Sequence, residues 1–221
     1  MEEQVEQSYT KLDDLLIDFQ VKCDGDLGIY ISILRLYNTN PADFPKHMRD
    51  MLIEHIVVKL FSEWERFLGN AFINYMLGEK SSNGVAPVRY AMPLDFDHAY
   101  RLIQNVNQYP DWSDIEKVLT NANNFFEQGG AFSILKTMKS DLNALKKLRN
   151  AIAHTSYRAR KDFENLVQGK VGYLPEGITP ARFLVDYKTP PTKNGVTFLE
   201  YYIAYLKSVA DIIVNFSGEQ S

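Results

Sequence analysis

The chain has 221 residues, 45% of them hydrophobic, and a formal net charge of −4 at pH 7. This hydrophobic fraction suffices for a packed core and excludes a disordered chain, and the acidic balance excludes a protein that is basic over its whole surface. Cys23 is the only cysteine, which rules out an intramolecular disulfide and a cysteine zinc site. Since domains usually have ~100–200 residues, residues 1–221 are expected to form a single elaborated domain.

The N-terminus and the hydropathy predict a cytoplasmic protein without membrane contact. Residues 1–10 are acidic and polar, unlike the basic and then apolar start of a signal peptide. No apolar run approaches the ~18 residues that a membrane-spanning helix needs.

The first part of the chain predicts three helical segments. Apolar residues at helical spacing indicate an amphipathic helix from about Glu3 to Lys22, and the sequence at 23–26, which contains Gly25, is expected to end it. Residues 27–36 are interpreted as a short helix, although their alternating isoleucines would also suit a strand. The longest helical pattern runs from Lys46 to Leu77, between loops at 38–45 and 79–93.

The central part predicts helices separated by breaks. One is expected from Asp95 to about Asn107, and the next ends near Phe126 with Ser113 or Asp111 as its cap. Gly129-Gly130 breaks the chain, after which a short helix at 131–138 is expected. Ser140 is expected to cap a further helix, at 141–155.

The C-terminal part predicts a loop, a short helix and a long one. Residues 169–177 are interpreted as a loop, and Thr179-Pro180 is a typical helix start. The prolines and the Asn-Gly pair at 190–195 predict a turn, and a strong apolar pattern predicts a final helix from Thr197 to Phe216. The chain is therefore expected to form an all-α helical bundle.

One segment carries candidate chemistry, the heptapeptide Leu-Arg-Asn-Ala-Ile-Ala-His at 148–154. On a helix, Leu142, Leu145, Leu148 and Ile152 share one stripe, which is expected to face the core. His154 lies roughly 165° from the centre of that stripe and is expected to be accessible. Asn150 lies one turn before His154 on the same face, Arg149 flanks that face, and Ala153 permits close approach of another helix.

These side chains suit RNA cleavage without a metal. The guanidinium of Arg149 offers a fork of donors for a phosphate, and a histidine such as His154 can move a proton near neutral pH. Attack by the RNA's own 2′-hydroxyl needs charge stabilisation at phosphorus and proton transfer, which one arginine and one histidine supply. Asn150 would position one of them or the RNA.

A local basic run surrounds this segment. Residues 136–161 contain eight basic side chains and a single acid, Asp141, in a chain that is acidic overall. Such a patch is typical of a surface that binds a phosphate backbone. Lys146, Arg158 and Arg160 are expected to contact RNA, and Tyr157 could stack on a base.

The sequence Arg149-Asn150-Ala-Ile-Ala-His154 resembles the R-x4-6-H signature of the HEPN superfamily. The upstream segment 61–67, with Glu63 and Glu65, is similar to the second helix of that family, and the closest resemblance is to the larger bacterial proteins of the RiboL-PSP-HEPN type. The resemblance implies a HEPN-like helical bundle with additional helices, a homodimer with the motif at its interface, and ribonuclease activity in toxin–antitoxin or antiphage systems. Glu63 and Glu65 are expected to be mainly structural, with one of them orienting Arg149, and Glu63 is the expected supporting residue.

The function predicted from sequence is therefore a metal-independent endoribonuclease with Arg149, His154 and Asn150 as catalytic residues, no cofactor, RNA as partner, and an antitoxin protein as a possible further partner. Two alternatives stay open. One is a HEPN module that binds RNA, a nucleotide or a protein without cleavage, and the other is a structural dimerisation protein. The histidines at 47, 55 and 98 form no zinc-binding pattern.

Overall fold

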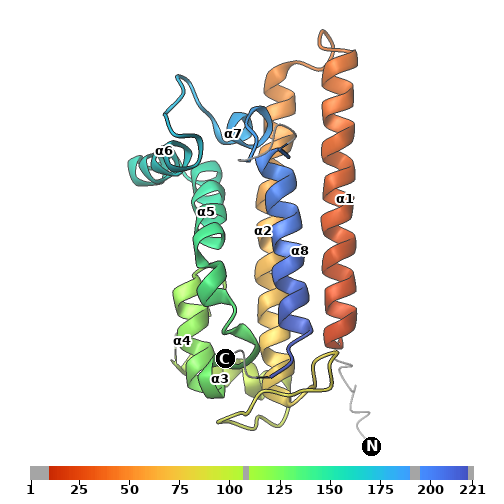
Figure 1. The fold of residues 1–221 in the computed structure, drawn as a ribbon, viewed down its shortest axis with the longest axis vertical. Helices are drawn as coiled ribbons and strands as arrows, with labels where there is room; N and C mark the ends of the chain where they lie inside the picture. The colour runs from red at the N-terminus through yellow and green to blue at the C-terminus, as the bar shows by residue number, and fades with distance from the viewer. Residues whose placement is uncertain (1–9, 107–109, 190–194, 219–221) are drawn as a thin grey trace, which may run out of the picture.

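The computed structural model describes residues 10–106, 110–189 and 195–218, which form an all-α bundle (Figure 1). Within these ranges the only β pairing consists of two isolated bridges, so the expected all-α class is confirmed. The helices are α1 (Leu12–Thr39), α2 (Lys46–Leu77), α3 (Phe96–Val106), α4 (Ile115–Phe125), the 3-10 helix η1 (Glu127–Phe132), α5 (Leu135–Ala153), α6 (Tyr157–Val171), α7 (Pro180–Asp186) and α8 (Phe198–Val214).

Three long helices, α1, α2 and α8, lie side by side along the long axis of the molecule, and α5 packs against α2 and α8 (Figure 1). α3 and α4 lie near the start of α5, and α6 and α7 lie at its end (Figure 1). Trp64, Tyr202 and Leu148 are all at most 1% exposed, so α2, α8 and α5 meet in one core. This arrangement fixes the C-terminal end of α5 at the surface, beside α6.

α1 is a single uninterrupted helix, so the expected break at 23–26 is wrong. Cys23 and Asp26 are each 1% exposed and face the bundle, and Lys59 on α2 donates to the Asp26 carboxylate at 2.6 Å. Gly25 is exposed, and a Cβ atom added there would meet no heavy atom within 4 Å. These tertiary contacts outweigh the ~1 kcal/mol that a glycine costs inside a helix. The helical interpretation of 27–36 is confirmed.

Several boundaries are confirmed closely. α2 has the expected bounds, and α3 begins one residue after the expected start. Thr179 caps α7 by accepting from the Arg182 N–H, with Pro180 at the first position. Thr197 and Glu200 form a capping box at the start of α8, which satisfies two backbone donors reciprocally. The turn expected from residues 190–194 lies outside the described residues.

The helix starts around α4 and α5 differ from expectation. α4 is capped by the Asp114 carboxylate, which accepts from two backbone N–H groups, while the Ser113 hydroxyl donates to Asp111 at 2.5 Å. α5 begins at Leu135, so the separate helix at 131–138 and the Ser140 cap are both wrong. Leu135 is fully buried, and this contact with the core extends the helix upstream through the polar residues around Ser140.

α6 is a helix that the sequence interpretation missed. Ser156 caps it, with its hydroxyl accepting from the Ala159 N–H at 3.2 Å. Phe163 and Val167 are buried one turn apart, which gives the helix a packing face despite its many charges. The loop expected to begin at 169 begins at Gly172, whose φ of +90° ends α6 in the left-handed conformation that glycine favours.

Candidate functional site at the end of α5

α5 presents the expected stripe to the core. Leu142, Leu145 and Leu148 are 2%, 1% and 0% exposed. Ile152 is only half-buried, because it lies in the last turn, where the helix leaves the bundle. The expectation of a buried stripe is therefore confirmed for three of its four residues.

His154 lies at the point where α5 ends. Its backbone is extended, with φ −132° and ψ 132°, and its N–H donates to the Asn150 carbonyl oxygen at 2.9 Å. The helix thus ends slightly before the expected limit of Thr155. The His154 side chain is exposed, which confirms the expected accessibility.

A cavity of about 430 Å³ opens beside His154. It is lined by His154 and Thr155, by Arg160, Phe163 and Glu164 of α6, and by residues 174–180. Of the four residues expected to bind RNA, Arg160 lines this cavity together with His154. The structure therefore places the imidazole of His154 and the guanidinium of Arg160 at the same cavity.

The Arg149 side chain lies against α2, away from the His154 cavity. Its guanidinium carbon lies 6.0 Å from the centre of the Phe61 ring on α2, and its Nη1 donates to the Asn150 side-chain oxygen at 3.3 Å. The Arg149 side chain is half-buried. Asn150 links the two parts of the motif, because its side chain holds Arg149 and its carbonyl oxygen holds the His154 backbone. Arg149 itself is not among the residues that line the His154 cavity.

Glu65 is an acid that interacts electrostatically with Arg149. Burial raises the pKa of the Glu65 carboxyl, and the nearby charges of Arg149 and Lys146 act in the opposite direction. Glu63, the expected supporting residue, accepts instead from Lys22 at 3.2 Å and pairs with Arg66 at 2.7 Å. A helical projection could have found this, because Glu65 lies one turn from Phe61 on the same face of α2, whereas Glu63 points elsewhere.

Acids from outside the basic run neutralise part of its positive charge. Lys146 pairs with Asp114, the N-cap of α4, at 3.0 Å, and Arg160 pairs with Glu164 at 3.0 Å. Lys139 also pairs with Glu116 of α4. The acids that neutralise the basic run lie outside it, on α4 and later in α6.

Two of the expected RNA contacts are freely available to solvent. Tyr157 is 82% exposed at the first residue of α6, and the Arg158 side chain is 93% exposed with a distant carboxylate, Asp162, at 4.0 Å. Both follow His154 closely in the chain, so they lie near the end of α5. Their exposure leaves them able to contact a ligand that extends beyond the cavity.

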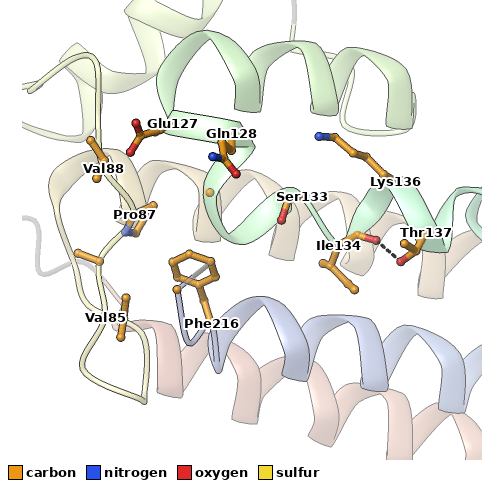
Figure 2. A pocket seen from close by; sticks show the side chains of 13 residues that line it. Val85, Pro87, Val88, Glu127, Gln128, Ser133, Ile134, Lys136, Thr137 and Phe216 are labelled. Atoms are coloured by element: carbon orange, nitrogen blue, oxygen red, sulfur yellow. Dashed lines mark hydrogen bonds between the residues drawn. The ribbon is translucent and has the colours of Figure 1, made fainter. Parts of the chain in front are cut away.

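A larger cavity, of about 680 Å³, lies near the start of α5 (Figure 2). Glu127, Ser133 and Lys136 supply polar groups to it, and Pro87 and Phe216 supply apolar ones. With 19 residues in α5 and a rise of ~1.5 Å per residue, it lies about 28 Å from His154. This cavity contains none of the predicted site residues.

Comparison of the chain with protein-family models, with curated proteins and with solved structures found no significant match. Within the ranges that the structure describes, no three His, Cys, Asp or Glu side chains are grouped to hold a metal ion. No helix in those ranges has the length and apolar character needed to span a membrane.

Proposed function

We propose that the protein is a HEPN-type, metal-independent endoribonuclease that acts in the cytoplasm in a toxin or antiphage role. The observation that carries the proposal is the exposed His154 at the end of α5, on the wall of a cavity that it shares with Arg160. Arg149 and Asn150 precede it on the same helix and are held to each other by a hydrogen bond. These groups supply a proton-transfer residue and phosphate-binding guanidinium groups in one region.

The reaction follows from these groups. One imidazole accepts the proton of the RNA 2′-hydroxyl as the 2′-oxygen attacks the adjacent phosphorus. The bond from phosphorus to the 5′-oxygen breaks, and a second proton donor protonates that leaving oxygen. The products are a 2′,3′-cyclic phosphate and a 5′-hydroxyl. The Arg149 guanidinium stabilises the charge that develops on the non-bridging oxygens.

The proposed active form is a twofold dimer. In one subunit Arg149 faces α2 and His154 faces α6, so a site that uses both is best completed by a second copy. A twofold axis near the end of α5 places the same patch on both subunits, and the exposed Ala153 permits close approach. The second subunit's histidine then serves as the proton donor. Light scattering at micromolar concentration tests this, and a monomer would contradict it.

The decisive experiment is incubation of the purified protein with mixed RNA in the presence of EDTA. We expect cleavage that leaves 2′,3′-cyclic phosphate ends, and no cleavage of DNA of the same sequence, which lacks the attacking 2′-hydroxyl. His154→Ala protein prepared in parallel controls for contaminating ribonucleases. Cleavage that the variant retains in full would remove His154 from the mechanism.

A non-catalytic module that binds RNA, a nucleotide or a protein partner is the second candidate. The pairing of Lys146 with Asp114 and of Arg160 with Glu164 favours it, because these contacts reduce the positive charge available to a phosphate backbone. An antitoxin protein that covers the end of α5 is one such partner. Wild-type protein that binds RNA and leaves it intact would support the binding module over the enzyme.

A further inference from the structure

The wall of the cavity beside His154 is held in place by the protein itself. Arg182 of α7 donates from Nη1 to the carbonyl oxygens of Glu176 and Gly177, at 3.1 Å and 2.7 Å. The Arg182 N–H also donates to Thr179 at 3.2 Å, which caps α7. Two successive carbonyls and a helix cap therefore fix the turn at 176–179. Since this turn needs no ligand to form, the cavity is preorganised.

The interior of the cavity suits a flat apolar group. Phe163 is 4% exposed, and its ring contacts Phe183 edge-on, with centres 6.3 Å apart at 82°. The apolar side chains of Leu174, Pro175 and Ile178 also line the cavity. The volume of about 430 Å³ falls within the ~300–1,000 Å³ range of small-molecule sites. A planar ring, such as a nucleobase, suits a cavity lined by an aromatic side chain and aliphatic ones.

Glu164 and Glu176 are the two acids that line this cavity, and Glu164 is the less exposed of them. One carboxylate oxygen accepts from Arg160 Nε at 3.0 Å, and the other lies 3.8 Å from Lys161 Nζ. The side chain is 21% exposed. A carboxylate has about four acceptor positions, so Glu164 keeps capacity for further donors. Its negative charge repels a phosphate from the inner cavity and favours a ligand edge that carries N–H groups.

Among the four RNA bases, guanine matches a carboxylate best. Its ring N1–H and its exocyclic amino group lie side by side and can donate to both oxygens. Adenine and cytosine present one amino group next to a ring acceptor, and uracil presents one N–H between two carbonyl oxygens. Those acceptors would face the carboxylate and repel it, which penalises the three other bases.

We infer that this cavity binds the guanine base of the nucleotide next to the cleaved bond, with Glu164 as the specificity-determining residue. The inference rests on the proposed function, because it assumes an RNA substrate at His154. With the base between Phe163 and Leu174, the attached ribose and phosphate lie toward His154 and Arg160. The cavity thereby aligns one particular phosphate with the imidazole.

The inference is tested by calorimetric titration of the four 3′-mononucleotides into the wild-type chain. We expect 3′-GMP to bind at least tenfold more tightly than 3′-AMP, 3′-CMP or 3′-UMP. Glu164→Gln should reduce the ratio of 3′-GMP affinity to 3′-UMP affinity at least tenfold. The substitution removes a negative charge and can strengthen phosphate binding, but this gain is common to both nucleotides and does not change the ratio. Asp162→Asn is the matched control, because Asp162 is an acid of the same helix that does not line the cavity, and it should leave the ratio unchanged.

A second variant guards against a folding defect in Glu164→Gln. Leu174 is 44% exposed, so Leu174→Trp should fold normally, fill the cavity and abolish 3′-GMP binding. Equal affinity for the four nucleotides, or a ratio that survives both substitutions, overturns the inference. If the protein then cleaves RNA without base preference, the proposed ribonuclease function is retained and only the guanine site is rejected. Guanine-selective binding that depends on Glu164, in a protein that cuts no RNA, supports the cavity and removes the ribonuclease.

Discussion

The backbone N–H of His154 donates to the carbonyl oxygen of Asn150 across 2.9 Å, and this bond closes the last turn of α5. The His154 side chain takes no part in it and is exposed. The backbone of the motif therefore places His154 at the end of the helix. Its chemistry can be removed by substitution without removing the end of the helix.

His154→Ala should separate catalysis from folding. We expect RNA cleavage to fall by roughly 10²–10⁴-fold, as is typical when a proton-transfer group is removed, while the free energy of unfolding changes by less than about 0.5 kcal/mol. Single-turnover cleavage and urea unfolding measure the two quantities. A variant that loses activity only because it unfolds would contradict this expectation.

Arg149→Ala should damage both binding and cleavage. Loss of a group that stabilises the developing charge should slow cleavage by roughly 10²–10³-fold. The slope of log affinity against log salt for single-stranded RNA should fall by about 0.7, the value for one lost phosphate contact.

Arg149→Lys should restore the charge and little of the activity, because an ammonium group cannot reproduce a bidentate fork. Arg101→Ala is the matched control, since it removes one exposed positive charge from α3. If Arg101→Ala weakened binding as much as Arg149→Ala, net charge alone would explain the effect.

Glu65→Gln should stabilise the fold at neutral pH. Burial raises the pKa of the Glu65 carboxyl above its usual value of 4.5, against the opposing charge of Arg149. The native state therefore disfavours the ionised form, and at pH 7 the charge lowers stability. The gain from Glu65→Gln should be largest at pH 7 and should fade as the pH falls through the folded-state pKa toward 4.5. Thermal unfolding between pH 4 and pH 7 measures it, and a gain that grows on acidification would have the wrong sign.

The pair formed by Asp26 and Lys59 should respond unequally to its two deletions. Asp26 is 1% exposed, whereas the Lys59 side chain is 44% exposed. Lys59→Met leaves a carboxylate buried without its partner and should cost about 3–5 kcal/mol. Asp26→Asn lets Lys59 turn to water and should cost about 1 kcal/mol. Equal losses in urea unfolding would show that the burial of Asp26 is not what makes the pair important.

Local sequence patterns were sufficient to predict the helices that have long apolar stripes. The stripe of α2 predicted both of its ends, and the Thr-Pro pair at 179–180 and the segment from Thr197 predicted α7 and α8. The same periodicity placed Leu142, Leu145 and Leu148 in the core and His154 at the surface. These features depend on residues within one or two helical turns of each other, so the local sequence is enough to predict them.

The sequence by itself therefore determined the all-α class, the main helices and the exposure of His154 at the end of α5. Only the tertiary structure decided that α1 continues through Gly25, because Lys59, which binds the Asp26 carboxylate, comes from another helix. It also decided that acids at the start of α4 neutralise part of the basic run. It formed the cavity at His154 from α6 and the turn at 176–179. Each of these depends on charges and contacts between segments far apart in the chain, which local spacing does not encode.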